Sequence, residues 1–202
     1  MMNFLPLFLL LAFAALALVL PLVRLARAHG KWGIVGARDP VQKVMVASLM
    51  GAVGVALVWT LAFAFMAPGP LGVWVLDPIW AWLGLALGVL GMLLVAWAQL
   101  QMGASWRIGI PEESPGLVTS GIFAWVRHPI YTGLFAVTAG VVLMSPSPWS
   151  VMGGAWLISI IGIQARLEER YLHAVYGDAF TRWATEVGRF FPGVGRSSEQ
   201  VA

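Results

Sequence analysis

The sequence predicts an all-α integral membrane protein with about five transmembrane helices, and three observations support this fold class. Hydrophobic residues make up 60% of the 202 residues and charged residues only 10%, whereas soluble domains carry about 25% charged residues. Apolar blocks recur along the chain, and several reach the roughly 20 residues that a helix needs to cross a bilayer. Every Lys and Arg falls in segments that this arrangement places on one side of the membrane.

The first three apolar blocks form the expected N-terminal membrane region. They run from about Phe4 to Val23, from Val44 to Met66, and from Trp74 or Pro78 to Gln101. The first block lacks the basic start and cleavage site of a signal peptide, so we expect it to be retained as a span. The third contains Gly84 and Gly88 at the GxxxG spacing that favours close helix packing. Two unrelated glycines in an apolar run explain this spacing equally well.

A second apolar region, residues 129–163, is divided by the turn Ser145-Pro146-Ser147-Pro148. Because each half is shorter than the earlier spans, we expect a helical hairpin of two short or tilted spans. The polar segment before it, residues 102–125, is expected to be an ordered loop that does not span. After the hairpin we expect helices over residues 166–175 and 179–187, separated by a stop at Tyr176-Gly177.

These elements divide the chain into three expected parts. Residues 1–101 form a three-span membrane region, and residues 102–192 contain the loop, the hairpin and a C-terminal helical segment. Residues 193–202 are expected to be a disordered tail. The polar residues of the second part make it the candidate for chemistry.

The distribution of basic residues predicts the orientation. Five fall in the loop after the first span, two after the third span and five in the C-terminal region, which accounts for all twelve. Since basic residues concentrate in cytosolic loops, we expect a cytosolic C-terminal segment and an N-terminus outside. The modest net charge of +3 is then explained by topology, and no nucleic-acid partner is expected.

Two classes of site are disfavoured by composition. The chain has no cysteine, which excludes disulfides and thiolate metal sites. Its three histidines are His29, His128 and His173, too few and too scattered for a multi-histidine metal site, so no metal is expected. We expect His29 and His173 to be interfacial or solvated.

Two polar motifs flank the expected hairpin and therefore meet at one membrane face. The first is residues 127–131 (Arg-His-Pro-Ile-Tyr) and the second is residues 166–170 (Arg-Leu-Glu-Glu-Arg). Proline at a helix start leaves neighbouring N–H groups free, and these favour an anion. Glu168 and Glu169 suit an amine, a ribose diol or a cation. S-adenosylmethionine combines all of these groups.

Ordinary structural roles explain each motif taken alone. Arg127 and His128 could be interfacial anchors, and Tyr131 could belong to an aromatic belt. Glu168 and Glu169 could form a solvated helix face with local ion pairs. Spacing and composition by themselves identify no reaction.

The region 102–192 resembles isoprenylcysteine carboxyl methyltransferases and the related phospholipid N-methyltransferases. The resemblance rests on the stretch 116–133 with its Arg-His-Pro-x-Tyr motif, on Glu168-Glu169, on Tyr176-Gly177 and on Phe191-Pro192. It implies a methyltransferase embedded in the membrane that uses S-adenosylmethionine without a Rossmann fold. In agreement, no GxGxxG follows a strand pattern in the sequence.

The resemblance also implies roles for individual residues. The implied cofactor-binding residues are Gly116, Leu117, Val118, Phe123, His128, Pro129, Ile130, Tyr131 and Glu168. The implied catalytic residues are Arg127 or Arg166, which would hold an acceptor carboxylate, and Glu169, which would accept a proton from an amine acceptor. Phe123 replaces a tyrosine of the family, and Gln164 replaces an arginine associated with acceptor binding.

The expected activity is methyl transfer to a lipophilic acceptor that enters from the bilayer between helices, with membrane lipids as surroundings. The acceptor would be an isoprenylcysteine-type carboxylate or a related group, and a phospholipid amine is the alternative. Two other readings remain: an NADPH-dependent oxidoreductase similar to sterol reductases, and a membrane scaffold without catalysis.

Overall fold

The computed structural model describes residues 2–29, 40–66, 69–103 and 116–197. The helices are η1 (Met2–Phe4), α1 (Leu5–Ala14), the π-helical η2 (Ala15–Val19), α2 (Leu20–His29), α3 (Pro40–Phe65), η3 (Gly69–Leu71), α4 (Ile79–Met102), η5 (Gly121–Ala124), α5 (Pro129–Met144), α6 (Pro148–Tyr176) and α7 (Asp178–Glu186). Within the described ranges, β-type pairing is limited to two isolated bridges, one of which joins Val126 to Gly188.

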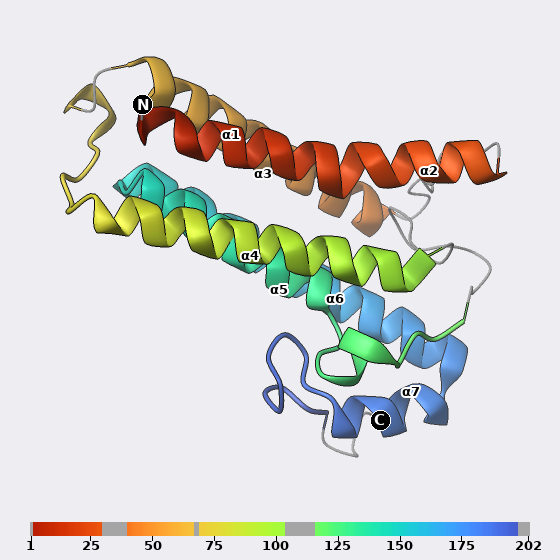
Figure 1. Cartoon of the computed structure of the whole chain (residues 1–202). Coiled ribbons are helices and arrows are strands. Elements are labelled where there is room, and N and C mark those ends of the chain that lie inside the picture. The colour runs from red at the N-terminus through yellow and green to blue at the C-terminus, as the bar shows by residue number, and fades with distance from the viewer. Residues whose placement is uncertain (1, 30–39, 67–68, 104–115, 198–202) are drawn as a thin grey trace.

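The predicted all-α integral membrane fold is confirmed. Among the described residues, three helices are long and apolar enough to cross a membrane: α3 over Lys43–Phe65, α4 and α6. Two shorter apolar helices, Met2–Ala17 and α5, accompany them. The helices lie roughly alongside one another, whereas α7 and the segment after it lie at one end of the bundle (Figure 1). The exact number of crossings stays a prediction.

The first apolar block forms one continuous helical rod from Met2 to His29, six residues beyond the expected end at Val23. No helix breaker follows Val23, so the helix continues into the basic segment. A hydrogen bond from α4 stabilises the π-helical turn η2. The side-chain amide of Gln99 donates to the carbonyl oxygen of Ala17 at 2.7 Å.

Glycines form the contact between α4 and α5. A Cβ added to Gly91 would lie 2.5 Å from the carbonyl oxygen of Gly133, and a Cβ on Gly140 would lie 2.5 Å from the carbonyl oxygen of Gly84. Such distances are shorter than any normal contact, so the helices approach backbone to backbone. A Cβ on Gly88 would collide with Leu9 of α1. The packing role of the Gly84–Gly88 pair is therefore confirmed.

The hairpin is less symmetric than expected. Helix α5 has the predicted length, with 16 residues, but α6 has 29 residues and continues past Ile163 to Tyr176. The expectation of two short arms is wrong for α6, because no breaker separates Ile163 from the polar segment. A capping box between Ser147 and Ser150 begins the helix. At about 44 Å, α6 is longer than the apolar core of a bilayer.

The chain after α6 is ordered further than expected. Helix α7 agrees with its prediction to within one residue. The tail expected to be disordered from residue 193 has a defined conformation through Ser197: Arg189 N–H donates to Val194 O at 2.8 Å, and Ser197 N–H donates to Ala184 O at 2.9 Å. Residues 198–202, and the part of the expected loop over residues 104–115, lie outside the described residues.

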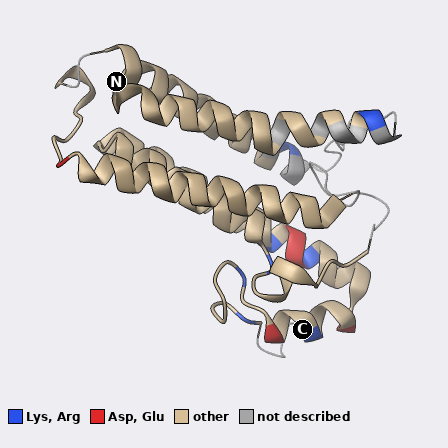
Figure 2. Cartoon of the chain, in the orientation of Figure 1, with Lys and Arg blue, Asp and Glu red and all other residues tan. Residues whose placement is uncertain are grey.

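Charged residues gather at the end of the bundle that carries α7 (Figure 2). The opposite end holds the N-terminus and the turns that join α3 to α4 and α5 to α6 (Figure 1). The described part of the chain thus keeps the one-sided distribution of basic residues on which the predicted orientation rests.

Candidate active site

The two polar motifs converge, as predicted, where α5 begins and the polar part of α6 passes it. The Tyr131 hydroxyl donates to Oε1 of Glu168. His128 lies between the two acids, with Nε2 at 3.3 Å from Oε1 of Glu169 and Nδ1 at 3.7 Å from Oε2 of Glu168. The unbroken α6 places both glutamates beside the start of α5.

Glu168 is the accessible acid of the pair. Its side chain is 31% exposed, and its Oε1 accepts from both Tyr131 and the side-chain amide of Gln164, the latter at 3.1 Å. The ring of Tyr131 stacks on that of His128 with 5.4 Å between centroids and 18° between planes. Gln164, which sequence reasoning treated only as a departure from the family pattern, is therefore part of the site.

Glu169, by contrast, is buried and surrounded by basic groups. Arg127 Nε lies 3.0 Å from its Oε1, and Arg189 donates from Nε at 3.0 Å and from Nη2 at 2.5 Å. We call this set of Glu169, Arg127 and Arg189 the Glu169 clamp. A carboxylate that accepts so many charged hydrogen bonds is stabilised in its ionised form, so it is a poor proton acceptor. This geometry does not favour the expected role of Glu169 as a base.

Arg127 is engaged almost completely inside the protein. Its side chain is 0% exposed. Nη1 donates to Ala184 O and Val187 O, both at 2.6 Å, and Nη2 donates to Gly195 O at 2.9 Å. The first two carbonyls belong to the C-terminal turn of α7, which normally lacks helical partners, so Arg127 caps this helix. Because its donors are used in this way, Arg127 has little capacity to bind the carboxylate of a methyl acceptor.

Burial also affects the charge on Arg127. It lowers the pKa of the guanidinium, and the neighbouring Glu169 carboxylate partly offsets this effect. Because a guanidinium keeps its proton in proteins, Arg127 is a cation beside Glu169. Arg166, the other expected acceptor-binding residue, is exposed on α6.

The backbone of residues 188–190 docks against the start of α5. Arg127 N–H donates to Gly188 O at 2.8 Å, His128 N–H donates to Arg189 O at 3.0 Å, and Thr132 Oγ1 donates to Phe190 O at 2.6 Å. The His128 N–H is therefore not free for an anion, contrary to expectation. Pro129, the first residue of α5, is fully buried. Sequence reasoning treated Arg189 only as a topological charge, although it lies two residues before the Phe191-Pro192 motif.

The remaining expected cofactor-binding residues, apart from the exposed Gly116, lie in or against one apolar core. Phe123 is buried in a cluster that includes Phe180 and Trp183 of α7, and the Trp183 indole N–H donates to Phe123 O at 3.1 Å. Leu117, Val118 and Ile130 pack against the same cluster. Gly116 N–H donates to the Tyr176 hydroxyl at 3.1 Å. The Phe123 ring thus contributes to packing at this position.

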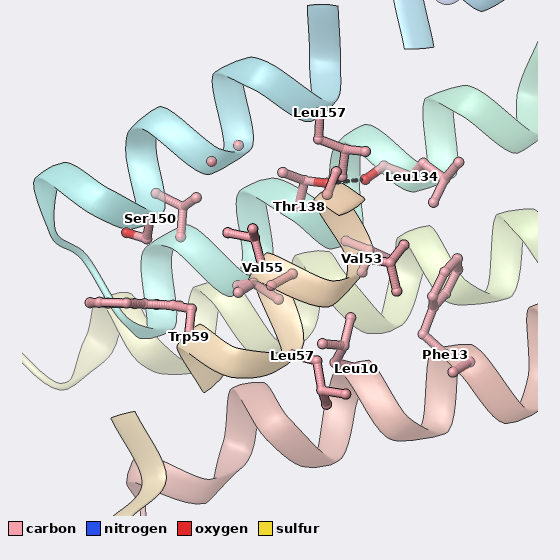
Figure 3. A pocket seen from close by; sticks show the side chains of 18 of the residues that line it. Leu10, Phe13, Val53, Val55, Leu57, Trp59, Leu134, Thr138, Ser150 and Leu157 are labelled. Atoms are coloured by element: carbon pink, nitrogen blue, oxygen red, sulfur yellow. Dashed lines mark hydrogen bonds between the residues drawn. The ribbon is translucent and has the colours of Figure 1, made fainter. Parts of the chain in front are cut away.

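An apolar pocket of about 180 Å³ opens between α1, α3, α5 and α6 (Figure 3). It extends from Leu134, three residues after Tyr131 on α5, toward Trp59 and Ser150 near the opposite end. The hydroxyl of Thr138 donates to Leu134 O at 2.8 Å, so this polar group is satisfied within its own helix. The pocket could not be predicted from the sequence, because four helices that are distant in the chain contribute its walls.

The chain is similar to several known proteins. The sequence pattern of the phospholipid methyltransferase family matches residues 79–179, half of the chain, which run from the start of α4 into α7. The chain belongs to the phospholipid methyltransferase family. Both motifs that form the site lie inside the matched segment, whereas Arg189 lies after it.

Several individual relatives share this region. Protein-S-isoprenylcysteine O-methyltransferase of Dictyostelium discoideum is 30% identical over 119 residues, which are 56% of this chain and 49% of the relative. Methanethiol S-methyltransferase of a Pseudomonas strain is 27% identical over 155 residues, which are 67% of this chain and 56% of the relative. The chain thus spans about half the length of the curated relatives it matches.

The fold is also shared with a solved structure, that of the eukaryotic intramembrane Ras methyltransferase ICMT. The two structures superimpose with a TM-score of 0.56 over 93% of this chain and 67% of the other, at 19% sequence identity. At this identity the comparison shows a common fold.

Proposed function

We propose that this protein is an S-adenosylmethionine-dependent methyltransferase of the membrane that acts on a lipophilic acceptor. The observation that carries the proposal is the partly exposed Glu168, held by Tyr131 and Gln164 beside His128 at the edge of the apolar bundle. Membership of the phospholipid methyltransferase family supports the same reaction class.

The residues present fit this methyl donor. Glu168 offers a carboxylate to an ammonium group or to ribose hydroxyls, and the stacked rings of His128 and Tyr131 offer a flat aromatic surface. When bound, S-adenosylmethionine supplies a methyl group activated by its sulfonium. The task of the protein is then to hold donor and acceptor in line, with the reacting atoms about 3 to 3.5 Å apart, and to exclude water.

The apolar pocket supports a lipophilic acceptor. It begins one helical turn from Tyr131 and is lined by aliphatic side chains of four helices. An apolar tail in this pocket would leave its polar head near Tyr131 and Glu168. The acceptors named for the relatives, isoprenylcysteine and methanethiol, differ in size but both present a reactive group on an apolar body.

The acceptor group that we propose first is an isoprenylcysteine-type carboxylate, which the exposed Arg166 would hold. One observation favours a second candidate, an amine or a thiol. Arg127 is engaged by Glu169 and by backbone carbonyls, and Arg189 is engaged by Glu169. A neutral acceptor needs no such cation and is compatible with the neutral Gln164.

Binding of S-adenosylmethionine tests the proposal directly. Isothermal titration of the purified full chain should detect binding, and both His128→Ala and Glu168→Ala should weaken it by at least about tenfold, since each removes a charged or polar contact. Glu186→Ala, which changes an exposed acid of α7, serves as the control and should bind like the wild type. Equal affinity in all four proteins, or binding of NADPH in place of S-adenosylmethionine, would contradict the proposal.

The acceptor is identified in a separate experiment. Membrane lipid extracts and S-farnesylcysteine are each incubated with the protein and methyl-labelled S-adenosylmethionine, and the products are analysed by mass spectrometry. A labelled carboxyl ester supports the first candidate, whereas label on nitrogen or sulfur supports the second.

A further inference from the structure

The Glu169 clamp joins three parts of the chain that are distant in sequence. Arg127 precedes α5, Glu169 lies on α6, and Arg189 follows α7. Arg127 additionally holds the carbonyls of Ala184, Val187 and Gly195. Glu169 and Arg127 are buried, and Glu169 also contacts His128, so the clamp can act on the site through His128.

His128 connects the clamp to the accessible acid. An ionised carboxylate can only accept hydrogen bonds, so the 3.3 Å contact with Glu169 favours the His128 tautomer in which Nε2 carries the proton. In a neutral ring the other nitrogen, Nδ1, then has a free lone pair. Nδ1 lies 3.7 Å from Oε2 of Glu168, which is too long for a direct hydrogen bond. This spacing is compatible with a ligand group that lies beside both atoms and donates one hydrogen bond to Nδ1 of His128 and one to Oε2 of Glu168.

We propose that Arg189 is a positioning residue, which fixes Glu169 and, through it, holds His128 with Nε2 protonated and Nδ1 directed toward the ligand beside Glu168. The ligand group recognised there is a hydrogen donor such as an ammonium or a hydroxyl. This inference rests on the proposed function and adds to it a residue outside the matched family segment.

The side chain and the backbone of Arg189 make different contacts. The docking of residues 188–190 on α5 uses Gly188 O, Arg189 O and Phe190 O, all of which are main-chain atoms. The Arg189 side chain is 29% exposed and donates to both oxygens of Glu169. Truncating it therefore removes the contacts of Arg189 with Glu169, while the backbone contacts and the Arg127–Glu169 pair remain. Arg127 is a less informative position, because its loss would also uncap α7.

The first test measures the affinity of the full chain for S-adenosylmethionine. Arg189→Met should weaken binding by about tenfold, within the range seen for coupled neighbours. Arg189→Lys, which keeps the charge but not the planar pair of donors, should recover part of the loss. Arg182→Met, an exposed arginine of α7, is the matched control and should bind like the wild type. Wild-type affinity in Arg189→Met would overturn the inference.

A double-mutant cycle tests whether Arg189 acts through Glu169. If it does, Arg189→Met combined with Glu169→Gln should bind no more weakly than the weaker single variant. Losses that multiply would show that Arg189 acts independently and would overturn the inference. If Arg189→Met does not fold, the same double-mutant cycle is measured with Arg189→Lys in its place. A wild-type protein that binds no S-adenosylmethionine would contradict the proposed function itself, which is a different outcome.

Nitrogen NMR gives a readout that a loss of stability alone would not produce. The chain has three histidines, so ¹⁵N-histidine labelling in a His29→Gln, His173→Gln background reports on His128 alone. The wild-type ring should show one protonated and one unprotonated nitrogen, with Nε2 protonated. Arg189→Met should show a mixture of tautomers, whereas an unchanged Nε2-protonated ring would overturn the inference.

Discussion

Glu168 and Glu169 are adjacent in sequence and have opposite environments. Successive residues of a helix point about 100° apart, so Glu168 faces the accessible side with Tyr131 and Gln164, whereas Glu169 faces the clamp. Under the proposed function, the same two-residue motif supplies one acid for ligand binding and one for positioning. Sequence reasoning gave Glu169 a catalytic role because nothing in the motif distinguishes the two acids.

At the residue scale, we predict that Tyr131→Phe weakens binding of S-adenosylmethionine by roughly tenfold. The substitution keeps the ring that stacks on His128 but removes the hydroxyl that donates to Glu168, and a hydrogen bond to a charged group contributes about 1.5 to 3 kcal/mol. Isothermal titration measures the change. Ser159→Ala, which removes an exposed hydroxyl of α6, should have wild-type affinity. Unchanged affinity in Tyr131→Phe would exclude a role for the hydroxyl.

At the scale of elements, the glycines between α4 and α5 determine where α5 begins relative to the bundle. Gly84 and Gly91 lie against the backbone of Gly140 and Gly133, so the two helices approach more closely than side chains would allow. Since α5 begins with the Arg127–Tyr131 motif, this contact also positions the site. The GxxxG spacing indicated the contact, but it did not identify the partner helix.

We predict that Gly91→Ala destabilises the protein by about 1 to 3 kcal/mol, the usual cost of overpacking. Its Cβ would lie 2.5 Å from Gly133 O, a backbone atom that cannot move independently. Thermal unfolding in detergent, followed by tryptophan fluorescence, should show a lower Tm. Gly54→Ala is the control, because a Cβ there meets nothing within 4 Å, and its Tm should be unchanged or higher. Equal Tm values for the two variants would contradict the packing argument.

At the scale of the whole molecule, the bundle separates an apolar pocket from a charged end. The pocket lies among α1, α3, α5 and α6, and the clamp and Glu168 lie where α6 extends beyond the apolar region. A lipophilic acceptor can then keep its tail in the bilayer region while its reactive group reaches the polar site. This arrangement depends on α6 being one long helix.

Filling the pocket should impair transfer to a lipophilic acceptor more than it impairs cofactor binding. Gly153 lines the pocket, and a Cβ there meets nothing within 4 Å, so Gly153→Leu adds a side chain without a backbone clash. We expect a higher KM for S-farnesylcysteine, or for the acceptor found in lipid extracts, with unchanged affinity for S-adenosylmethionine. Gly54→Leu, which lies outside the pocket, is the control. An unchanged KM in Gly153→Leu would place the acceptor elsewhere.

The predicted orientation is tested by cysteine labelling, which the absence of native cysteines makes simple. Asp77→Cys lies in the turn between α3 and α4, and Glu186→Cys lies at the end of α7. With the charged end in the cytosol, a membrane-impermeant maleimide applied to intact cells should label position 77 and should label position 186 only after the membrane is opened. The reverse pattern would invert the topology.

The sequence by itself determined the class of fold, the positions of most helices and some of the residues that meet at the site, though not Gln164 or Arg189. Hydrophobic block length and charge are local properties, and a hairpin necessarily returns its two ends to one face, so the convergence of Tyr131 and Glu168 was predictable. The length of α6 was misjudged because a helix continues through a change of polarity when no breaker interrupts it.

Only the tertiary structure decided the roles within the site. The commitment of Arg127 to α7 carbonyls, the approach of Arg189 to Glu169 and the order of residues 193–197 all depend on contacts between segments about 20 to 70 residues apart. Arginines look equivalent in a sequence, and only their surroundings in the fold distinguish Arg127, which binds α7 carbonyls, from Arg189, which binds Glu169, and from the exposed Arg166.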